Sequence, residues 1–129
     1  MDTRTPRIPG PDHPITIEPA GRRITVRVAD RVVADTTAAL TLHEAGYRPV
    51  HYIPIRDVDQ TLLRSSRTST YCPYKGDASY FSIDGPDGDI EDAIWTYEHP
   101  YEAVDAIAGH VAFYADRVEI SEARDGADA

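Results

Sequence analysis

Short runs of alternating apolar and polar residues recur along this chain, and proline or glycine follows many of them. In the clearest run, Ile24, Val26 and Val28 alternate with polar or small residues. Such alternation is typical of a strand with one buried face, and clusters of proline and glycine mark the turns between strands. The sequence therefore predicts a mainly β fold of about nine short strands, with a hairpin that pairs residues 68–72 with residues 78–83.

Two short helices are expected beside these strands. Asp57 is an N-cap candidate for a helix over residues 58–63, and Pro100 starts a second helical segment that runs to about Ala108. We expect two small antiparallel sheets arranged as a β-tent or open barrel, with one or two short helices. Several strands are too short to enclose a large core, so a homodimer is compatible with the sequence.

The 129 residues suit one domain. Residues 1–13 are rich in proline and predict an extended N-terminal arm, residues 14–120 form the β domain, and residues 121–129 predict a disordered acidic tail. The N-terminus lacks the apolar stretch of a secretory signal, and no run approaches the roughly 20 apolar residues that cross a bilayer. A single cysteine forms no internal disulfide, which suits the reducing cytosol, so we expect a cytoplasmic protein. Because no long apolar run is present, we expect no membrane partner.

The net charge of −9 is unevenly distributed. Residues 76–129 carry 14 acidic side chains and 2 arginines, whereas residues 56–75 carry 4 basic and 2 acidic side chains. A nucleic-acid partner is not expected, because duplex binding needs a dominant basic face. A small basic region on an acidic protein suits a small anionic ligand better, although the acidic residues also favour solubility by themselves.

Residues 65–76 contain the only cysteine and the only lysine of the chain, Cys72 and Lys75. The other 12 basic side chains are arginines, so a position that keeps lysine indicates a need for a slim point charge. Lys75 is a candidate for neutralising a phosphate or carboxylate of a ligand, and Gly76 permits close approach of the backbone. The alternative is a solvated lysine in a turn.

Cys72 and Lys75 are also the two candidate catalytic residues. A cysteine reacts well as a thiolate, which a neighbouring cation such as Lys75 or Arg67 favours, and His51 or His110 would serve as the base. The alternative is that Cys72 is a small buried apolar side chain at the end of a strand. The sequence leaves open whether the protein is an enzyme.

Aromatic and basic side chains complete the candidate site. Trp95 and Tyr97 are two positions apart on one strand face, so both are expected to line one pocket. Arg64 and Arg67 suit recognition of a carboxylate or phosphate, or else pair with surface acids. The expected ligand-binding residues are Arg64, Arg67, Tyr74, Lys75, Trp95, Tyr97 and His110.

Several kinds of site are not expected. One cysteine and scattered histidines do not match the spacing of a zinc site, and Asp84, Asp87 and Asp89 fit a hairpin tip better than a metal loop. The sequence has no glycine-rich phosphate loop, nucleophile elbow or dinucleotide fingerprint. We therefore expect neither a metal nor a cofactor.

Three motifs resemble a known family. They are Tyr52-Ile53-Pro54-Ile55-Arg56, Tyr71-Cys72-Pro73-Tyr74-Lys75-Gly76 and Gly109-His110-Val111-Ala112-Phe113-Tyr114. They resemble a small bacterial and fungal family known as a domain of unknown function and sometimes labelled nucleotidyltransferase-like, over about residues 14–120. The resemblance implies a β-tent, in which two small antiparallel sheets meet at an angle. Nucleotidyl transfer normally needs two metal-holding carboxylates beside a Gly-Ser turn, and the sequence lacks that pair.

Three functions follow as hypotheses. The first is a domain that binds a small anionic or aromatic metabolite in a groove beside the Cys-Pro-Tyr-Lys-Gly turn. The second is an enzyme that acts on a nucleotide-like or other anionic substrate through Cys72 or Lys75. The third is a protein-interaction module that uses a sheet edge, which a large exposed apolar patch would support.

Overall fold

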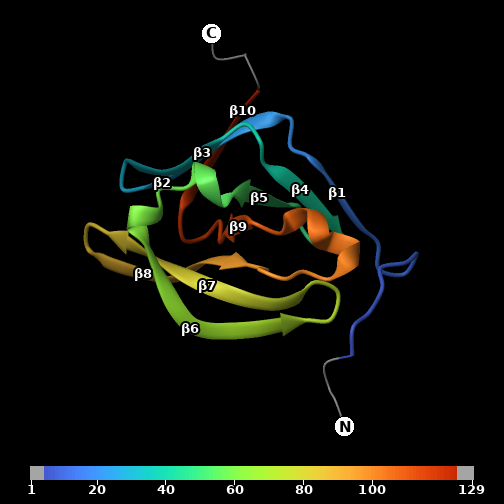
Figure 1. Ribbon diagram of the computed structural model, residues 1–129. Coiled ribbons are helices and arrows are strands. Elements are labelled where there is room, and N and C mark those ends of the chain that lie inside the picture. The colour runs from blue at the N-terminus through green and yellow to red at the C-terminus, as the bar shows by residue number, and fades with distance from the viewer. Residues whose placement is uncertain (1–4, 125–129) are drawn as a thin grey trace.

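The computed structural model describes residues 5–124 (Figure 1), and within them ten strands form two sheets. The strands are β1 (Ile15–Pro19), β2 (Arg22–Val28), β3 (Arg31–Thr36), β4 (Leu40–Glu44), β5 (Val50–Pro54), β6 (Leu63–Cys72), β7 (Gly76–Gly85), β8 (Gly88–Thr96), β9 (His110–Phe113) and β10 (Glu119–Arg124). Three short 3₁₀ helices connect them: η1 (Ile55–Asp57), η2 (Gln60–Leu62) and η3 (Glu102–Ile107). None of the helices in this range is long and apolar enough to span a bilayer.

The larger sheet has the strand order β1-β4-β5-β9-β8-β7-β6, and the smaller has the order β10-β2-β3. Neighbouring strands in both sheets run antiparallel. In Figure 1, β6, β7 and β8 lie at the bottom and β2 and β3 at the top, with η1 and η2 at the left between them. The expected mainly β fold with two antiparallel sheets is confirmed, and the sheets remain open.

Local turn chemistry explains two of the hairpins. Between β2 and β3, Ala29 and Asp30 both have positive φ, at 48° and 69°, which matches the right-handed twist of the flanking strands. Between β7 and β8, a Cβ at Gly85 would lie 2.8 Å from the carbonyl oxygen of Gly88, so the tight tip requires glycine. The expected tip at residues 84–89 is confirmed, as is the pairing of residues 68–72 with β7.

Two apolar clusters hold the fold together. One lies between the sheets and includes Ile24 and Val26 of β2 with Ile53 and Ile94 of the larger sheet. The other is formed mainly by the larger sheet and η3, and Tyr52 is its largest fully buried member. Successive residues of β5, Tyr52 and Ile53, belong to different clusters because neighbouring side chains of a strand point to opposite faces.

The expected helix over residues 58–63 is present only as the single 3₁₀ turn η2, and its expected N-cap, Asp57, is wrong. Val58 is extended (φ −108°, ψ 140°) and forms a β-bridge with Ala34, which ends η1. The carboxylate of Asp57 accepts a hydrogen bond from Thr36 Oγ1 at 2.6 Å and therefore caps no helix. Asp59 instead caps η2 by accepting from the backbone N–H of Thr61.

Within the described residues 5–124, parts of both terminal segments bond to the rest of the fold. β10 begins at Glu119 and includes residues 121–124, which were expected in the tail, because these residues pair with β2. Residues 125–129 lie outside the described part of the chain. Within the expected N-terminal arm, the backbone N–H of Arg7 donates to Pro73 O at 2.8 Å. The arm thus reaches the Cys-Pro-Tyr-Lys turn.

Candidate functional site

Lys75 is buried in the turn between β6 and β7, where its ammonium group meets a carboxylate. Lys75 Nζ donates to Glu44 Oε1 at 2.5 Å, and the two side chains retain only 10% and 13% of their exposure. The ammonium also lies 5.9 Å from the centre of the Tyr97 ring. The structure therefore gives Lys75 an internal counter-charge, 31 positions away along the chain.

The Lys75 turn is held against neighbouring segments by its backbone. The N–H of Tyr101 donates to Lys75 O at 3.0 Å, and the N–H of Lys75 donates to Cys72 O at 3.2 Å. Gly76 has φ +111°, and a Cβ there would lie 3.4 Å from the carbonyl oxygen of His99. Glycine is suited to this position because it adopts that backbone conformation without strain and permits the close approach.

His13 of the N-terminal arm is the second partner of Glu44. Its Nε2 lies 2.7 Å from Glu44 Oε2, and its ring stacks on Tyr74 with 4.0 Å between centres and an interplanar angle of 3°. Both carboxylate oxygens of Glu44 are thus occupied by basic groups. Burial raises the pKa of Glu44, but hydrogen bonds and charges from Lys75 and His13 bring it below 4.5.

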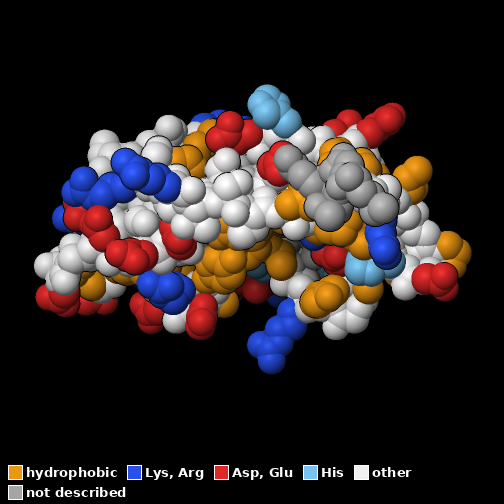
Figure 2. All heavy atoms as spheres, turned by 90° about the horizontal axis from the view of Figure 1, so that it is seen from below, with side chains coloured by type: hydrophobic (Ala, Val, Ile, Leu, Met, Phe, Trp, Pro, Cys, Tyr) orange, Lys and Arg blue, Asp and Glu red, His pale blue; other side chains and the backbone are white. Residues whose placement is uncertain are grey.

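A cavity of about 190 Å³ opens beside the Lys75–Glu44 pair. Its walls are largely aromatic, and they place Trp95 and Tyr97 together with Lys75 as their spacing suggested. The full lining is Leu42, Glu44, Val50, Tyr52, Lys75, Tyr80, Trp95, Tyr97 and Tyr114. We call this space the Lys75 cavity. Figure 2, which views the molecule from below, shows hydrophobic side chains reaching the surface in the middle of one face with charged side chains around them.

Three tyrosines of the Lys75 cavity, Tyr52, Tyr97 and Tyr114, are neutral phenols near pH 7. Burial raises the pKa of both Tyr52 and Tyr97 well above the ordinary value of 10, and burial together with a hydrogen bond to Tyr80 raises that of Tyr114 to about 12. Tyr52 OH accepts from Trp95 Nε1 at 3.2 Å. These hydroxyl groups can therefore donate to or accept from a ligand, but they do not supply a base.

The other expected ligand-binding residues lie outside the lining of the Lys75 cavity. Arg64 pairs with Asp89 at 3.2 Å and Asp84 at 3.6 Å on the β7–β8 hairpin. Arg67 is exposed in the bulged part of β6, and His110 Nδ1 lies 2.9 Å from Ala108 O at the start of β9. Tyr74 contributes indirectly by stacking on His13.

Cys72, the candidate nucleophile, is partly buried at the end of β6 and packs against the cluster of Tyr52 and Tyr97. It does not line the Lys75 cavity. Neither His51 nor His110 lines the cavity. Within residues 5–124, no group of three or more His, Cys, Asp or Glu side chains is arranged to hold a metal ion.

Glu44 and His13 are the members of this site that the sequence analysis missed. A signal for Glu44 was available: it follows Leu40 and Leu42 at the same two-residue spacing, so alternation places a carboxylate on the apolar face of β4. A buried charge requires a partner, and the sole lysine is the obvious one. His13 has no such signal, because the arm that carries it is irregular.

We expect the stability lost in Glu44→Gln to shrink as the pH falls. A carboxyl group whose folded-state pKa is lowered stabilises the fold fully above its unfolded pKa, here about 4.5, and that stabilisation disappears as the pH falls through the folded value. Urea unfolding of both proteins at pH 7, 5, 4 and 3 measures the difference. Glu98→Gln, at an exposed carboxylate, is the control and should follow the wild type throughout. If the difference in free energy of unfolding between Glu44→Gln and the wild type stays constant down to pH 3, this expectation is contradicted.

Comparison with known proteins places the whole β fold in one family. The search of curated proteins gave no match. A family model described as "Domain of unknown function (DUF427)" and named NTP_transf_9 matches residues 16–124, which include every strand except the first residue of β1. This match agrees with the resemblance carried by the Tyr71-to-Gly76 motif. The chain belongs to the DUF427 family.

Proposed function

We propose that this protein is a small-molecule-binding domain and that its ligand is a neutral, planar aromatic ring held in the Lys75 cavity. The observation that carries the proposal is a buried ammonium–carboxylate pair set beside one indole and four phenol rings. Binding sites for small molecules commonly combine apolar walls with a few converging polar groups.

Size limits the part of a ligand that this cavity accepts. A cavity of about 150 Å³ is sufficient to bind benzene. The Lys75 cavity, at about 190 Å³, therefore suits one aromatic ring with a small substituent. Trp95 and Tyr97 offer ring faces and edges for stacking contacts.

The charges of Lys75 and Glu44 determine which aromatic ligands the cavity favours. Lys75 alone would favour an anion, but Glu44 offsets its charge within the same cavity. A ligand that both accepts a hydrogen bond from the ammonium and donates one to the carboxylate satisfies the pair, and an amide edge does both. A carboxylate of the same shape would face Glu44 at close range, so the anionic ligands suggested by the sequence become the weaker alternative.

Benzamide and benzoate test this proposal because they differ mainly in charge. We expect benzamide to bind about tenfold more tightly than benzoate, and Lys75→Met to weaken benzamide binding about tenfold, since it removes a charge-assisted hydrogen bond. Isothermal titration calorimetry measures both, and circular dichroism verifies that the variant is folded. Arg64→Gln is the control and should bind as the wild type does, because Arg64 of β6 does not line the Lys75 cavity and pairs instead with Asp89. Absence of saturable benzamide binding, or equal affinities for the two compounds, would refute the proposal.

A further inference from the structure

A second cavity, of about 400 Å³, lies between the two sheets, and we call it the inter-sheet cavity. Ile24 and Ile120 line it from the smaller sheet, and Ile53, Trp95 and Phe113 line it from the larger. Ile24 and Ile53 are fully buried, so the floor of this cavity is the apolar core itself. Its volume falls within the roughly 300–1,000 Å³ that is usual for small-molecule sites.

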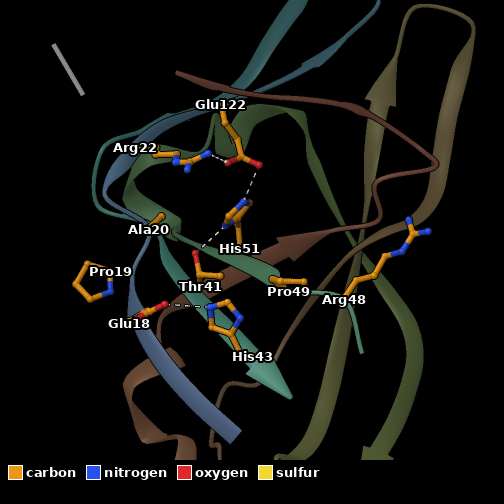
Figure 3. Close-up of a pocket in the computed structure, with 10 residues that line it drawn as sticks. All are labelled: Glu18, Pro19, Ala20, Arg22, Thr41, His43, Arg48, Pro49, His51 and Glu122. Carbon is orange, nitrogen blue, oxygen red and sulfur yellow. Dashed lines mark hydrogen bonds and ion pairs between the residues drawn. The ribbon is translucent and has the colours of Figure 1, made fainter. Parts of the chain in front are cut away.

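Glu122 stands at the mouth of the inter-sheet cavity, and its carboxylate is already bound. Figure 3 shows the chain of contacts: Arg22 Nη1 donates to Glu122 at 3.3 Å, and His51 Nε2 lies 3.1 Å from the same carboxylate. Because a carboxylate only accepts, His51 donates from Nε2, and its Nδ1 lies 2.9 Å from Thr41 Oγ1. The hydrogen bond from His51 helps to keep the pKa of Glu122 below its ordinary value.

Arg48 lines the same mouth but takes no part in that chain. In Figure 3 its side chain extends away from Arg22, Glu122 and His51. No salt bridge joins Arg48 to another residue of the described range 5–124. Among the charged residues that line this cavity, Glu122 is already bound by Arg22 and His51, so Arg48 is the cation available to an incoming anion.

We propose that the inter-sheet cavity binds a small apolar monocarboxylate, with the hydrocarbon part between the sheets and the carboxylate at Arg48. Burial of each methylene group strengthens binding several-fold, so the apolar lining favours a chain or ring of several carbons. The guanidinium group matches a carboxylate with two parallel hydrogen bonds. This site is distinct from the Lys75 cavity and does not depend on the function proposed for it.

Trp95 provides a direct signal for this site. It is the only tryptophan of the chain, it lines both cavities, and its ring lies 4.5 Å from that of Tyr114, centre to centre. A hydrocarbon chain in the inter-sheet cavity would contact the indole and displace water from it. Fluorescence of the protein should therefore respond to occupancy without any added label.

Titration of Trp95 fluorescence with sodium octanoate below its micelle concentration tests the proposal, with octanol, octylamine and acetate as matched probes. We expect saturable binding of octanoate, weaker binding of octanol and octylamine, and no saturation with acetate. Arg48→Gln should weaken octanoate binding about fivefold, an effect usual for one partly exposed ion pair. Arg56→Gln, at an exposed arginine of η1, should leave octanoate binding unchanged.

A second variant fills the space instead of removing the charge. Ala115 lines the inter-sheet cavity and is exposed in the turn after β9, so Ala115→Leu should occupy part of the volume while the fold is retained. We expect this variant to lose most octanoate binding and to keep the unfolding midpoint of the wild type. The proposal is overturned if octanoate fails to bind, if octanol binds as tightly as octanoate, or if both Arg48→Gln and Ala115→Leu bind octanoate normally.

Discussion

Replacing Lys75 with methionine should lower the free energy of unfolding by about 2–3 kcal/mol, because the variant leaves Glu44 buried without its ammonium partner. Breaking a fully buried ion pair typically costs about 3–5 kcal/mol. The expected loss is smaller here, since Glu44 keeps its contact with His13 at 2.7 Å and both side chains touch solvent. Urea unfolding at pH 7 measures the change.

A double-mutant cycle separates the pair from its surroundings. Glu44→Gln should lower the free energy of unfolding at least as much as Lys75→Met does. The decrease in the double variant should be smaller than the sum of the two single decreases, and the difference should exceed about 1 kcal/mol. Arg23→Met is the matched control, since Arg23 and Asp35 lie 2.6 Å apart but are 45% and 37% exposed. Exposed pairs contribute about 0–1 kcal/mol. If Lys75→Met and Glu44→Gln each lower the free energy of unfolding as little as Arg23→Met does, the buried Lys75–Glu44 pair does not stabilise the fold as we expect.

Replacing Ile94 with alanine should lower the free energy of unfolding by about 3–4 kcal/mol, the largest effect that we expect from one substitution. Ile94 is fully buried on β8, and it packs in the cluster that joins the larger sheet to Ile24 and Val26 of β2. The alanine variant loses the transfer free energy of three carbon atoms and also leaves a cavity that the two sheets cannot easily close. Thermal and urea unfolding measure the loss.

Val32→Ala is the control for Ile94→Ala. Val32 lies on β3 in the smaller sheet, but its side chain is 43% exposed, so the loss should stay within about 0.5 kcal/mol. If Ile94→Ala is as mild as Val32→Ala, the contact between the sheets contributes less to stability than the burial of Ile94 indicates. A strongly reduced unfolding cooperativity would instead show that the two sheets can unfold separately.

Much of the fold could be predicted because its signals are local. Alternation at Ile24, Val26 and Val28 identifies β2, and the turn-forming residues between β7 and β8 identify their hairpin. The helix expected directly after Asp57 begins later and is shorter, as η2, for a non-local reason. Val58 pairs with Ala34 and Asp57 bonds to Thr36, so β3 imposes an extended backbone at Val58, where the local pattern favours a helix.

By itself, the sequence determined that this chain forms short antiparallel strands and that Lys75 occupies a rigid turn at the end of one of them. Only the tertiary structure decided what Lys75 faces. Glu44 comes from β4 and His13 from an irregular arm, and both lie far from Lys75 along the chain. Strand order and packing bring them together, and neither depends on residues adjacent to Lys75. Their meeting gives the lysine an internal partner and directs our proposal toward a neutral ligand.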